Sequence, residues 1–279
     1  ATVAWRLSAD YDTKPEEFAD LVEAFLDQVD PAAIRALIIG QWGEAYENPP
    51  PIELLAGLAP RLTGLRALFL GEMTFDECEI SWITQGNVTP LLAAYPGLEV
   101  FQVRGATEGL EFTPVRHTAL RELTIEAGGL PADGVRAVGG CDLPALEHLE
   151  LWLGTDEYGG DATVDDLAPI LAGTRLPSLG YLGLRNAEIA DQVAIALAGA
   201  PVVARLHTLD LSMGVLSNEG AEALLAGQPL AHLHRLDLHH HYISPELAAR
   251  IIEALPGVAI DLSGREEPDE GYRYVAVAE

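Results

Sequence analysis

The sequence LHTLDL at residues 206–211 returns 27 residues later as LHRLDL at residues 233–238. Both copies carry leucine at positions one, four and six. Because alternate residues of a β-strand face opposite sides, positions four and six point to the same side of a strand. Each copy therefore predicts a short strand that buries two leucines and presents the residues between them on the other face.

The same apolar pattern recurs along most of the chain, and successive copies begin 22 to 33 residues apart. The eight clear copies are Ile34-Leu37-Ile39, Leu65-Leu68-Leu70, Leu98-Phe101-Val103, Leu120-Leu123-Ile125, Leu146-Leu149-Leu151, Leu179-Leu182-Leu184, Leu206-Leu209-Leu211 and Leu233-Leu236-Leu238. A weaker ninth copy contains Ile260 and Leu262. One repeat cannot bury its apolar face alone, whereas stacked repeats form a continuous core. The sequence therefore predicts an α/β fold, a leucine-rich repeat solenoid (horseshoe) with a parallel inner β-sheet and outer helices.

Segments with helical period follow the later strands, at residues 164–171, 190–197, 218–225 and 244–255. The last begins with Ser244, Pro245 and Glu246, which are a capping residue, a proline suited to the first turn and an acid near the helix N-terminus. Strand and helix alternating at about 27 residues resembles the ribonuclease-inhibitor subclass of leucine-rich repeat proteins. That resemblance implies strands inside, helices outside and protein binding on the concave surface.

We expect one leucine-rich repeat domain over residues 1–279, because no stretch of the sequence is typical of a linker between domains. Residues 1–33 are expected to form an N-terminal cap with a short strand and an amphipathic helix, since an open solenoid end exposes core. Residues 34–263 hold about nine repeats. Residues 264–279 are expected to form the C-terminal cap, in which Tyr272 to Val277 adds a last edge strand.

The chain is strongly acidic, with 16 Lys and Arg residues against 43 Asp and Glu residues and a formal net charge of −27. Such a surface repels nucleic acid and anionic membranes, so we expect neither as a partner. It leaves a protein or peptide partner with a basic region, a cation, or no charged partner at all, since solubility alone explains such acidity. Of these we expect the protein or peptide partner. The two cysteines form no disulfide framework, no apolar run reaches the length of a spanning helix, and residues 1–12 do not have the pattern of a secretory signal. These features predict a cytoplasmic protein.

Three segments are more specific than the general repeat: EISWI at 79–83, LELWLG at 149–154 and LDLHHHY at 236–242. Together they resemble an uncharacterised family of bacterial single-domain leucine-rich repeat proteins, and the resemblance covers essentially the whole chain. It supports the fold and implies no catalytic residue.

Positions three, five and seven of each copy should face the concave side, where equal positions of adjacent strands form ladders about 4.7–4.9 Å apart. Position three runs through Ala36, Ala67, Val100, Glu122, His148, Tyr181, Thr208 and Arg235. Position five runs through Ile38, Phe69, Gln102, Thr124, Glu150, Gly183, Asp210, Asp237 and Asp261. Position seven runs through Gly40, Gly71, Arg104, Glu126, Trp152, Arg185, Ser212, His239 and Ser263. The first two repeats are small or apolar here, and the later ones are polar, aromatic and mostly acidic.

The middle and last repeats therefore carry the predicted partner-binding face. Its residues are Glu122, Glu126, His148, Glu150, Trp152, Tyr181, Arg185, Asp210, Asp237 and His239. Tryptophan, tyrosine and arginine are the residue types that most often anchor interfaces. The alternative is that Trp152 packs under the acidic loop 155–161 without a binding role. That loop does not match the ligand spacing of a calcium site.

A second hypothesis is a metal-dependent accessory protein or enzyme that uses Asp210, Asp237, His239 and His241. Imidazole and carboxylate groups ligate divalent transition metals. Two observations weigh against it: aspartate is a frequent filler at this repeat position, and successive histidines on a strand point in opposite directions. The aspartate ladder would repel itself, which favours a nearby cation, Arg235, or raised pKa values.

The insertion at residues 73–90 makes the second repeat long. It is a third candidate site, but the interpretation we favour is that Ile80, Trp82 and Ile83 fill core on the outer face. Cys78 lies between Glu77 and Glu79, which should raise its pKa and weaken it as a nucleophile. The sequence contains no phosphate-binding loop, dinucleotide fingerprint or zinc-protease motif, and no serine or cysteine paired with a base at a recognisable spacing. We therefore expect a non-enzymatic protein that needs no cofactor.

Overall fold

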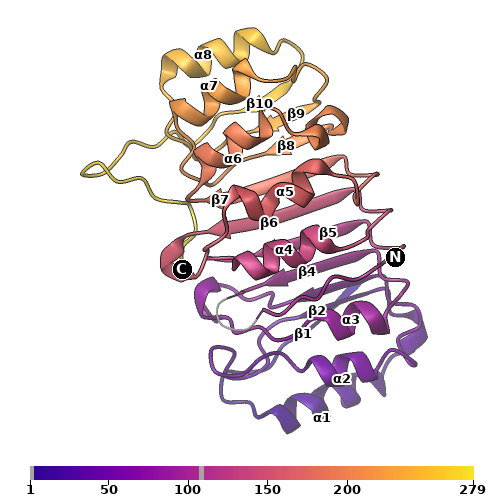
Figure 1. The fold of residues 1–279 in the computed structure, drawn as a ribbon. Helices are drawn as coiled ribbons and strands as arrows, with labels where there is room; N and C mark the ends of the chain where they lie inside the picture. Colours follow the sequence, from indigo (N-terminus) through magenta and orange to yellow (C-terminus); the bar gives the residue numbers. More distant parts are fainter. Residues whose placement is uncertain (1–2, 107–109) are drawn as a thin grey trace.

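The strands form one parallel sheet that follows the order of the sequence from β1 to β10. The computed structural model describes residues 3–106 and 110–279 (Figure 1). The strands are β1 (Ala4–Leu7), β2 (Ala36–Ile39), β3 (Ala67–Leu70), β4 (Val100–Arg104), β5 (Glu122–Glu126), β6 (His148–Gly154), β7 (Tyr181–Ala187), β8 (Thr208–Asp210), β9 (Arg235–Asp237) and β10 (Ala259–Asp261). The predicted leucine-rich repeat horseshoe, with parallel strands along its inner face, is confirmed.

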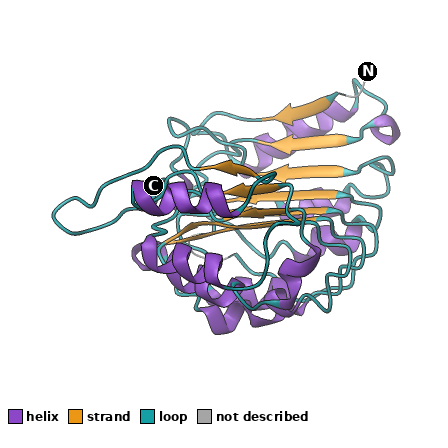
Figure 2. Cartoon of the chain, turned by 90° about the horizontal axis from the view of Figure 1, so that it is seen from above, coloured by secondary structure: helices purple, strands orange, loops and turns teal. Residues whose placement is uncertain are grey.

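The helices lie outside the curved sheet (Figure 2). They are α1 (Pro15–Leu26), α2 (Ile52–Gly57), α3 (Thr89–Ala94), α4 (Ala132–Gly140), α5 (Val164–Ala172), α6 (Ala190–Leu197), α7 (Asn218–Ala226) and α8 (Pro245–Ala254). The four helices predicted after the later strands correspond to α5 to α8. Their starts are capped locally: the Ser244 hydroxyl accepts from the Leu247 N–H at α8, and Thr163 forms a capping box with Asp166 at α5. None of the helices in the described ranges is long and apolar enough to cross a membrane.

The core lies between the sheet and the helices and consists of the repeated apolar positions. Leu209 and Leu236 are at most 1% exposed and pair in register across β8 and β9. At the N-terminal end, β1 pairs with β2, and α1 buries Phe18, Val22 and Leu26. The predicted strand and amphipathic helix are therefore present at the start of the solenoid.

The concave ladders have the predicted register. Position three is continuous from Ala36 to Arg235, and position five from Ile38 to Asp261. At position seven, Arg104 pairs with Glu126 and Trp152 pairs with Arg185. Side chains far apart in the sequence are therefore neighbours across one hollow surface.

The predicted last edge strand at residues 272–277 is wrong. A turn at Glu270 and Gly271, both with positive φ, sends the chain back along the loops that follow β9, β8 and β7. We call residues 272–279 the strap. Along its course, Tyr274 O accepts from His240 Nε2 at 3.0 Å, and Ala276 N donates to Met213 O at 2.8 Å. Figure 1 shows this yellow segment crossing several repeats.

Asn186, at the end of β7, is the central anchor of the strap. Its side chain accepts from Val277 N at 3.0 Å and donates to Val277 O. Beyond this point, Ala278 O accepts from the Ser81 hydroxyl, and the Tyr158 hydroxyl donates to the Glu279 carboxylate. The strap therefore connects the last repeats to the insertion after β3.

Within the insertion, the expectation for Trp82 is wrong. Ile80 and Ile83 are 8% and 0% exposed, as expected of core residues, but Trp82 is 57% exposed. Ile80 and Trp82 begin and end a short 3₁₀ turn, and Ile83 follows it. Ile80, Ser81 and Ile83 are buried, so Trp82 is the residue of this segment that the turn directs outward.

Candidate functional site

A polar cluster occupies the middle of the concave face on β6 and β7 and at the end of β8. We call it the hub: Glu150, Trp152, Tyr181, Arg185 and Asp210. Glu150 lies at its centre and is only 8% exposed. Its Oε1 accepts from Arg185 Nη1 at 2.6 Å and from Trp152 Nε1 at 2.7 Å. The carboxylate thus holds an arginine and a tryptophan in fixed positions.

The Tyr181 hydroxyl connects the hub to β8. It donates to Asp210 Oδ2 at 2.8 Å, and Glu150 Oε2 lies 3.1 Å away. The His148 ring stacks on the Tyr181 ring, with centroids 3.8 Å apart and planes 6° from parallel. Burial, followed by the charges of Asp210 and Glu150, raises the pKa of Tyr181, so its hydroxyl stays protonated and keeps its role as a donor.

Arg185 balances the two carboxylates. Its Nε donates to Ser212 Oγ at 2.9 Å and lies 3.4 Å from Asp210 Oδ2, while its guanidinium lies 5.4 Å from the Trp152 ring centroid. Burial alone would raise the pKa of Glu150, but the contact with His148, whose Nε2 lies 3.6 Å from Oε2, and the charge of Arg185 outweigh it and lower the pKa to about 2. Two carboxylates against one arginine leave the hub anionic.

A second ion pair lies beside the hub. Arg104 Nε donates to Glu126 Oε2 at 2.6 Å, and Gln102 Nε2 donates to Glu126 Oε1 at 2.6 Å. Glu126 is thereby buried and satisfied, whereas Glu122 on the same strand is exposed. Sequence reasoning left Arg104 and Gln102 out of the site, although their ladder positions beside Glu126 were a usable signal.

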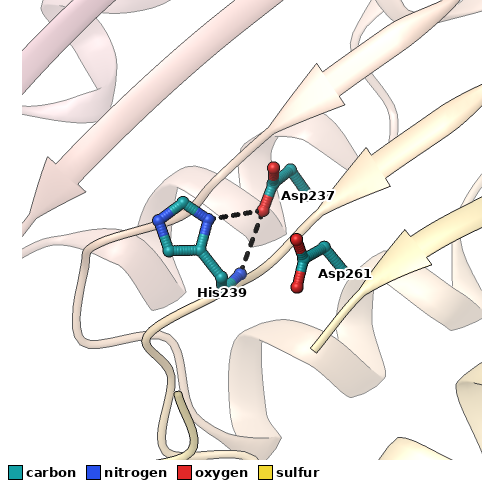
Figure 3. A group of neighbouring side chains, drawn as sticks. All are labelled: Asp237, His239 and Asp261. Atoms are coloured by element: carbon teal, nitrogen blue, oxygen red, sulfur yellow. Dashed lines mark hydrogen bonds and ion pairs between the residues drawn. The ribbon is translucent and has the colours of Figure 1, made fainter. Parts of the chain in front are cut away.

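A third cluster lies at the C-terminal end of the sheet. We call Asp237, His239 and Asp261 the terminal cluster (Figure 3). Each offers one atom within 4.8 Å of the others, and His239 Nδ1 lies 2.7 Å from Asp237 Oδ1. Arg235 Nη2 lies 2.7 Å from Asp237 Oδ2 and 3.3 Å from Asp261 Oδ2. A guanidinium therefore already supplies a positive charge to both aspartates.

The electrostatics of Asp237 follow from these contacts. Burial tends to raise its pKa, but hydrogen bonds from Arg235 and from His239 lower it below the ordinary value. Repulsion among the position-five aspartates therefore does not raise the pKa of Asp237 above its ordinary value. The ladder is stabilised by Arg235, which was one of the two expected solutions.

The structure separates the four predicted metal ligands. Asp237 and His239 are together, but Asp210 is held in the hub by Tyr181. His241 is 1% exposed, and both of its ring nitrogens are engaged, with Leu262 O at 3.1 Å and Ile243 N at 3.0 Å. The cause is the positive φ of His240, which redirects the chain after β9. Asp261, which was absent from the predicted ligand set, lies where a third ligand would be.

The acidic loop 155–161 is occupied with structural contacts. Asp161 Oδ1 accepts from Ala132 N at 2.7 Å at the start of α4, and Asp156 N donates to the Glu188 carboxylate at 3.0 Å. The Trp152 indole N–H donates to Glu150 within the hub. Among the described residues, the Trp152 side chain forms no hydrogen bond with loop 155–161.

Comparison with known proteins supports the fold. No family model and no curated protein sequence matches the chain. The crystal structure of a protein from Bacteroides fragilis is similar, with 29% sequence identity and a TM-score of 0.83 over 98% of this chain and 77% of that one. A TLR13 complex with a single-stranded RNA gives a TM-score of 0.44 at 13% identity, over 87% of this chain and 32% of that one. A leucine-rich repeat protein of Leptospira interrogans gives 0.23 at 13%, over 94% and 96%.

Proposed function

We propose that this chain is a single-domain, non-enzymatic scaffold that binds a protein or peptide with a basic region on its concave face. The hub carries this proposal. It presents Trp, Tyr and Arg side chains, the residue types that most often dominate binding energy, around an anionic centre. The ribonuclease-inhibitor-like alternation of strand and helix supports the same surface, because that arrangement leaves the inner face of the sheet uncovered by helices.

Preorganisation makes this surface suited to binding. Trp152, Tyr181 and Arg185 are each fixed by a hydrogen bond to a carboxylate in the free protein. A side chain that is already ordered loses less conformational entropy on association, a saving of about 0.5–1.5 kcal/mol per residue. The hub therefore supports recognition without a rearrangement of the sheet.

The thiols support a non-enzymatic role. Burial, with a contribution from Glu79, raises the pKa of Cys78 to about 11. Cys141 is fully buried, and burial raises its pKa too. A thiol with a raised pKa holds little thiolate near neutral pH and is a poor nucleophile.

The test is to select binders from a displayed library of fragments of the host genome and to measure their affinities by calorimetry. Glu122→Lys reverses an exposed charge on the concave face, and His148→Ala removes the ring stacked on Tyr181. We expect each to weaken a selected fragment about tenfold. The matched control is Glu253→Lys, an equal charge reversal at an exposed position on α8. Equal effects of the two charge reversals would contradict the concave site.

A second candidate function is metal binding at the terminal cluster, which brings one imidazole and two carboxylates together. A divalent cation there would have to displace Arg235 from both aspartates. Titration of the untagged protein with Zn²⁺ tests this candidate. Stoichiometric binding that is lost in His239→Ala and retained in His234→Ala would favour it, and heat equal to that of buffer alone would rule it out.

A further inference from the structure

A cavity of about 260 Å³ opens where the strap, the insertion and the concave face meet. The insertion contributes Met73, Phe75, Cys78 and Ile80, and Trp152 of β6 and Val277 of the strap face them. Phe75 is 66% exposed, so a large apolar ring stands at the cavity in contact with water. Neither the core nor the hub accounts for this feature.

The volume of the cavity indicates how large a bound group can be. Sites for small-molecule ligands and cofactors span about 300–1,000 Å³. This cavity lies below that range and is lined mainly by apolar side chains. It suits a single large apolar group such as the side chain of leucine, methionine or phenylalanine. Trp152 belongs both to the cavity and to the hub, so the two surfaces are continuous.

The charges around the cavity indicate which residues should flank that apolar side chain in a bound peptide. Arg104 also lines the cavity, but it is paired with Glu126 and donates to Met73 O, so it adds no free positive charge. The Tyr158 hydroxyl donates to Glu279, which lines the cavity.

Two further carboxylates, those of Glu157 and Glu79, lie close enough to act on the Tyr158 hydroxyl that donates to Glu279. The hydrogen bond to Glu279, followed by burial and the charges of Glu279, Glu157 and Glu79, raises the pKa of Tyr158 to about 12. Among the residues that the structure describes, none of these three carboxylates lies within 4.0 Å of a basic nitrogen. The rim therefore carries negative charge that a partner could neutralise.

We propose that this cavity binds one apolar side chain of a peptide segment in which a lysine or arginine flanks that side chain. The apolar group enters between Phe75, Trp152 and Val277, and the flanking cation lies at the rim beside Glu279. This inference rests on the proposed function, which it deepens by locating one anchor of the partner and stating its chemistry.

Cys78 provides a direct readout, because it lines the cavity and is half-buried while Cys141 is fully buried. The probe is the capped peptide acetyl-Gly-Arg-Leu-Arg-Gly-amide, and the measurement is the rate of Cys78 alkylation by iodoacetamide at pH 8.5. We expect the peptide to slow alkylation in a saturable manner. Replacing the central leucine by alanine should raise the required concentration about tenfold, since it removes most of the buried apolar area.

Two variants test the two parts of the proposal. Phe75→Ser should weaken protection by the leucine peptide several-fold, and Trp82→Ser, in the same insertion but away from the cavity lining, should leave it unchanged. Glu279→Gln should weaken the arginine-flanked peptide and not a serine-flanked one. The proposal is overturned if none of these peptides protects Cys78, or if the leucine and alanine peptides protect it equally. It is also overturned if only a second copy of the chain or a small molecule binds the cavity.

The selected genomic fragments separate this inference from the proposed function. If Glu122→Lys weakens a fragment and Phe75→Ser does not, the concave site stands and the cavity is no anchor. If neither variant weakens any fragment, both proposals fail.

Discussion

The hub and the terminal cluster are built from the same parts, yet their arginines differ in burial. Each has a carboxylate at ladder position five, Glu150 or Asp237, with an arginine bound to it. The side chain of Arg185 is 17% exposed, whereas that of Arg235 is 49% exposed. The hub lies on strands with neighbours on both sides, and the terminal cluster lies on β9 and the edge strand β10. Both carboxylates are buried, so it is the arginine near the edge of the stack that stays closer to water.

This difference has an energetic consequence. A buried carboxylate whose partner is removed leaves an uncompensated charge in a medium that screens poorly, whereas an exposed partner is solvated again. Equal substitutions should therefore cost more in the hub than at the terminal cluster.

The largest effect is expected for Glu150→Ala. The change leaves Arg185 with one carboxylate, Asp210, and removes the acceptor of the Trp152 N–H. Breaking a buried pair in this way should lower the free energy of unfolding by about 3–5 kcal/mol. Urea unfolding followed by far-ultraviolet circular dichroism measures it. Glu147→Ala on the same repeat, whose side chain is 57% exposed, is the control and should cost less than about 1 kcal/mol. Equal losses would show that the hub is not stabilised as a buried network.

The next effect is a dependence of stability on pH. The pKa of Glu150 is about 2 in the folded protein against 4.5 ordinarily. Its contribution is therefore complete above pH 4.5 and is lost as the pH falls from 4.5 toward 2, a change of about 3 kcal/mol. Stability measured across this range should fall more steeply in the wild type than in Glu150→Gln, which cannot take up the proton. Parallel curves would contradict the lowered pKa.

The sequence predicts the ladders well because two regular features set them. Alternation along a strand decides which residues face inward, and the spacing of the leucines fixes the register that places Glu150 beside Gly183. The hydrogen bonds within the hub depend on side-chain rotamers, which no periodicity encodes. The predicted ladder neighbours were therefore right, and they already placed Arg104 beside Glu126, while the Glu150–Arg185 pair required the structure.

Two features were mispredicted: the position of His241, for a reason local to the backbone, and the strap, because its contacts are distant in the sequence. His241 was grouped with His239 because strand alternation was assumed to continue, but the positive φ of His240 ends it. The strap could not be found because its main anchor joins residues 91 positions apart. The alternating pattern of residues 272–277 was compatible with a strand, and only tertiary contacts decide between the two.

A smaller effect is expected for Asp237→Ala in the terminal cluster. It removes acceptors from Arg235 and from the N–H of His239, but the guanidinium is half-exposed and regains water. We expect a loss of about 1–2 kcal/mol in the free energy of unfolding. The ratio to Glu150→Ala, measured by the same urea titration, is the informative quantity. A loss of free energy of unfolding as large as that of Glu150→Ala would show that the exposure of the arginine does not set the cost of removing its carboxylate.

The smallest effect concerns the strap. Asn186→Gly keeps the backbone at its φ of 52° and removes the side chain that holds Val277. Since glycine adopts positive φ freely, the loss of about 1 kcal/mol should come from the two hydrogen bonds and not from backbone strain. Hydrogen exchange should rise at residues 275–278 and remain unchanged on β8, whose strand contacts are intact. Asn186→Ala adds strain at the same position, so an equal loss in both variants assigns the effect to the side chain. Unchanged exchange in the strap of Asn186→Gly would show that Met213 and Ser81 hold the strap without this anchor.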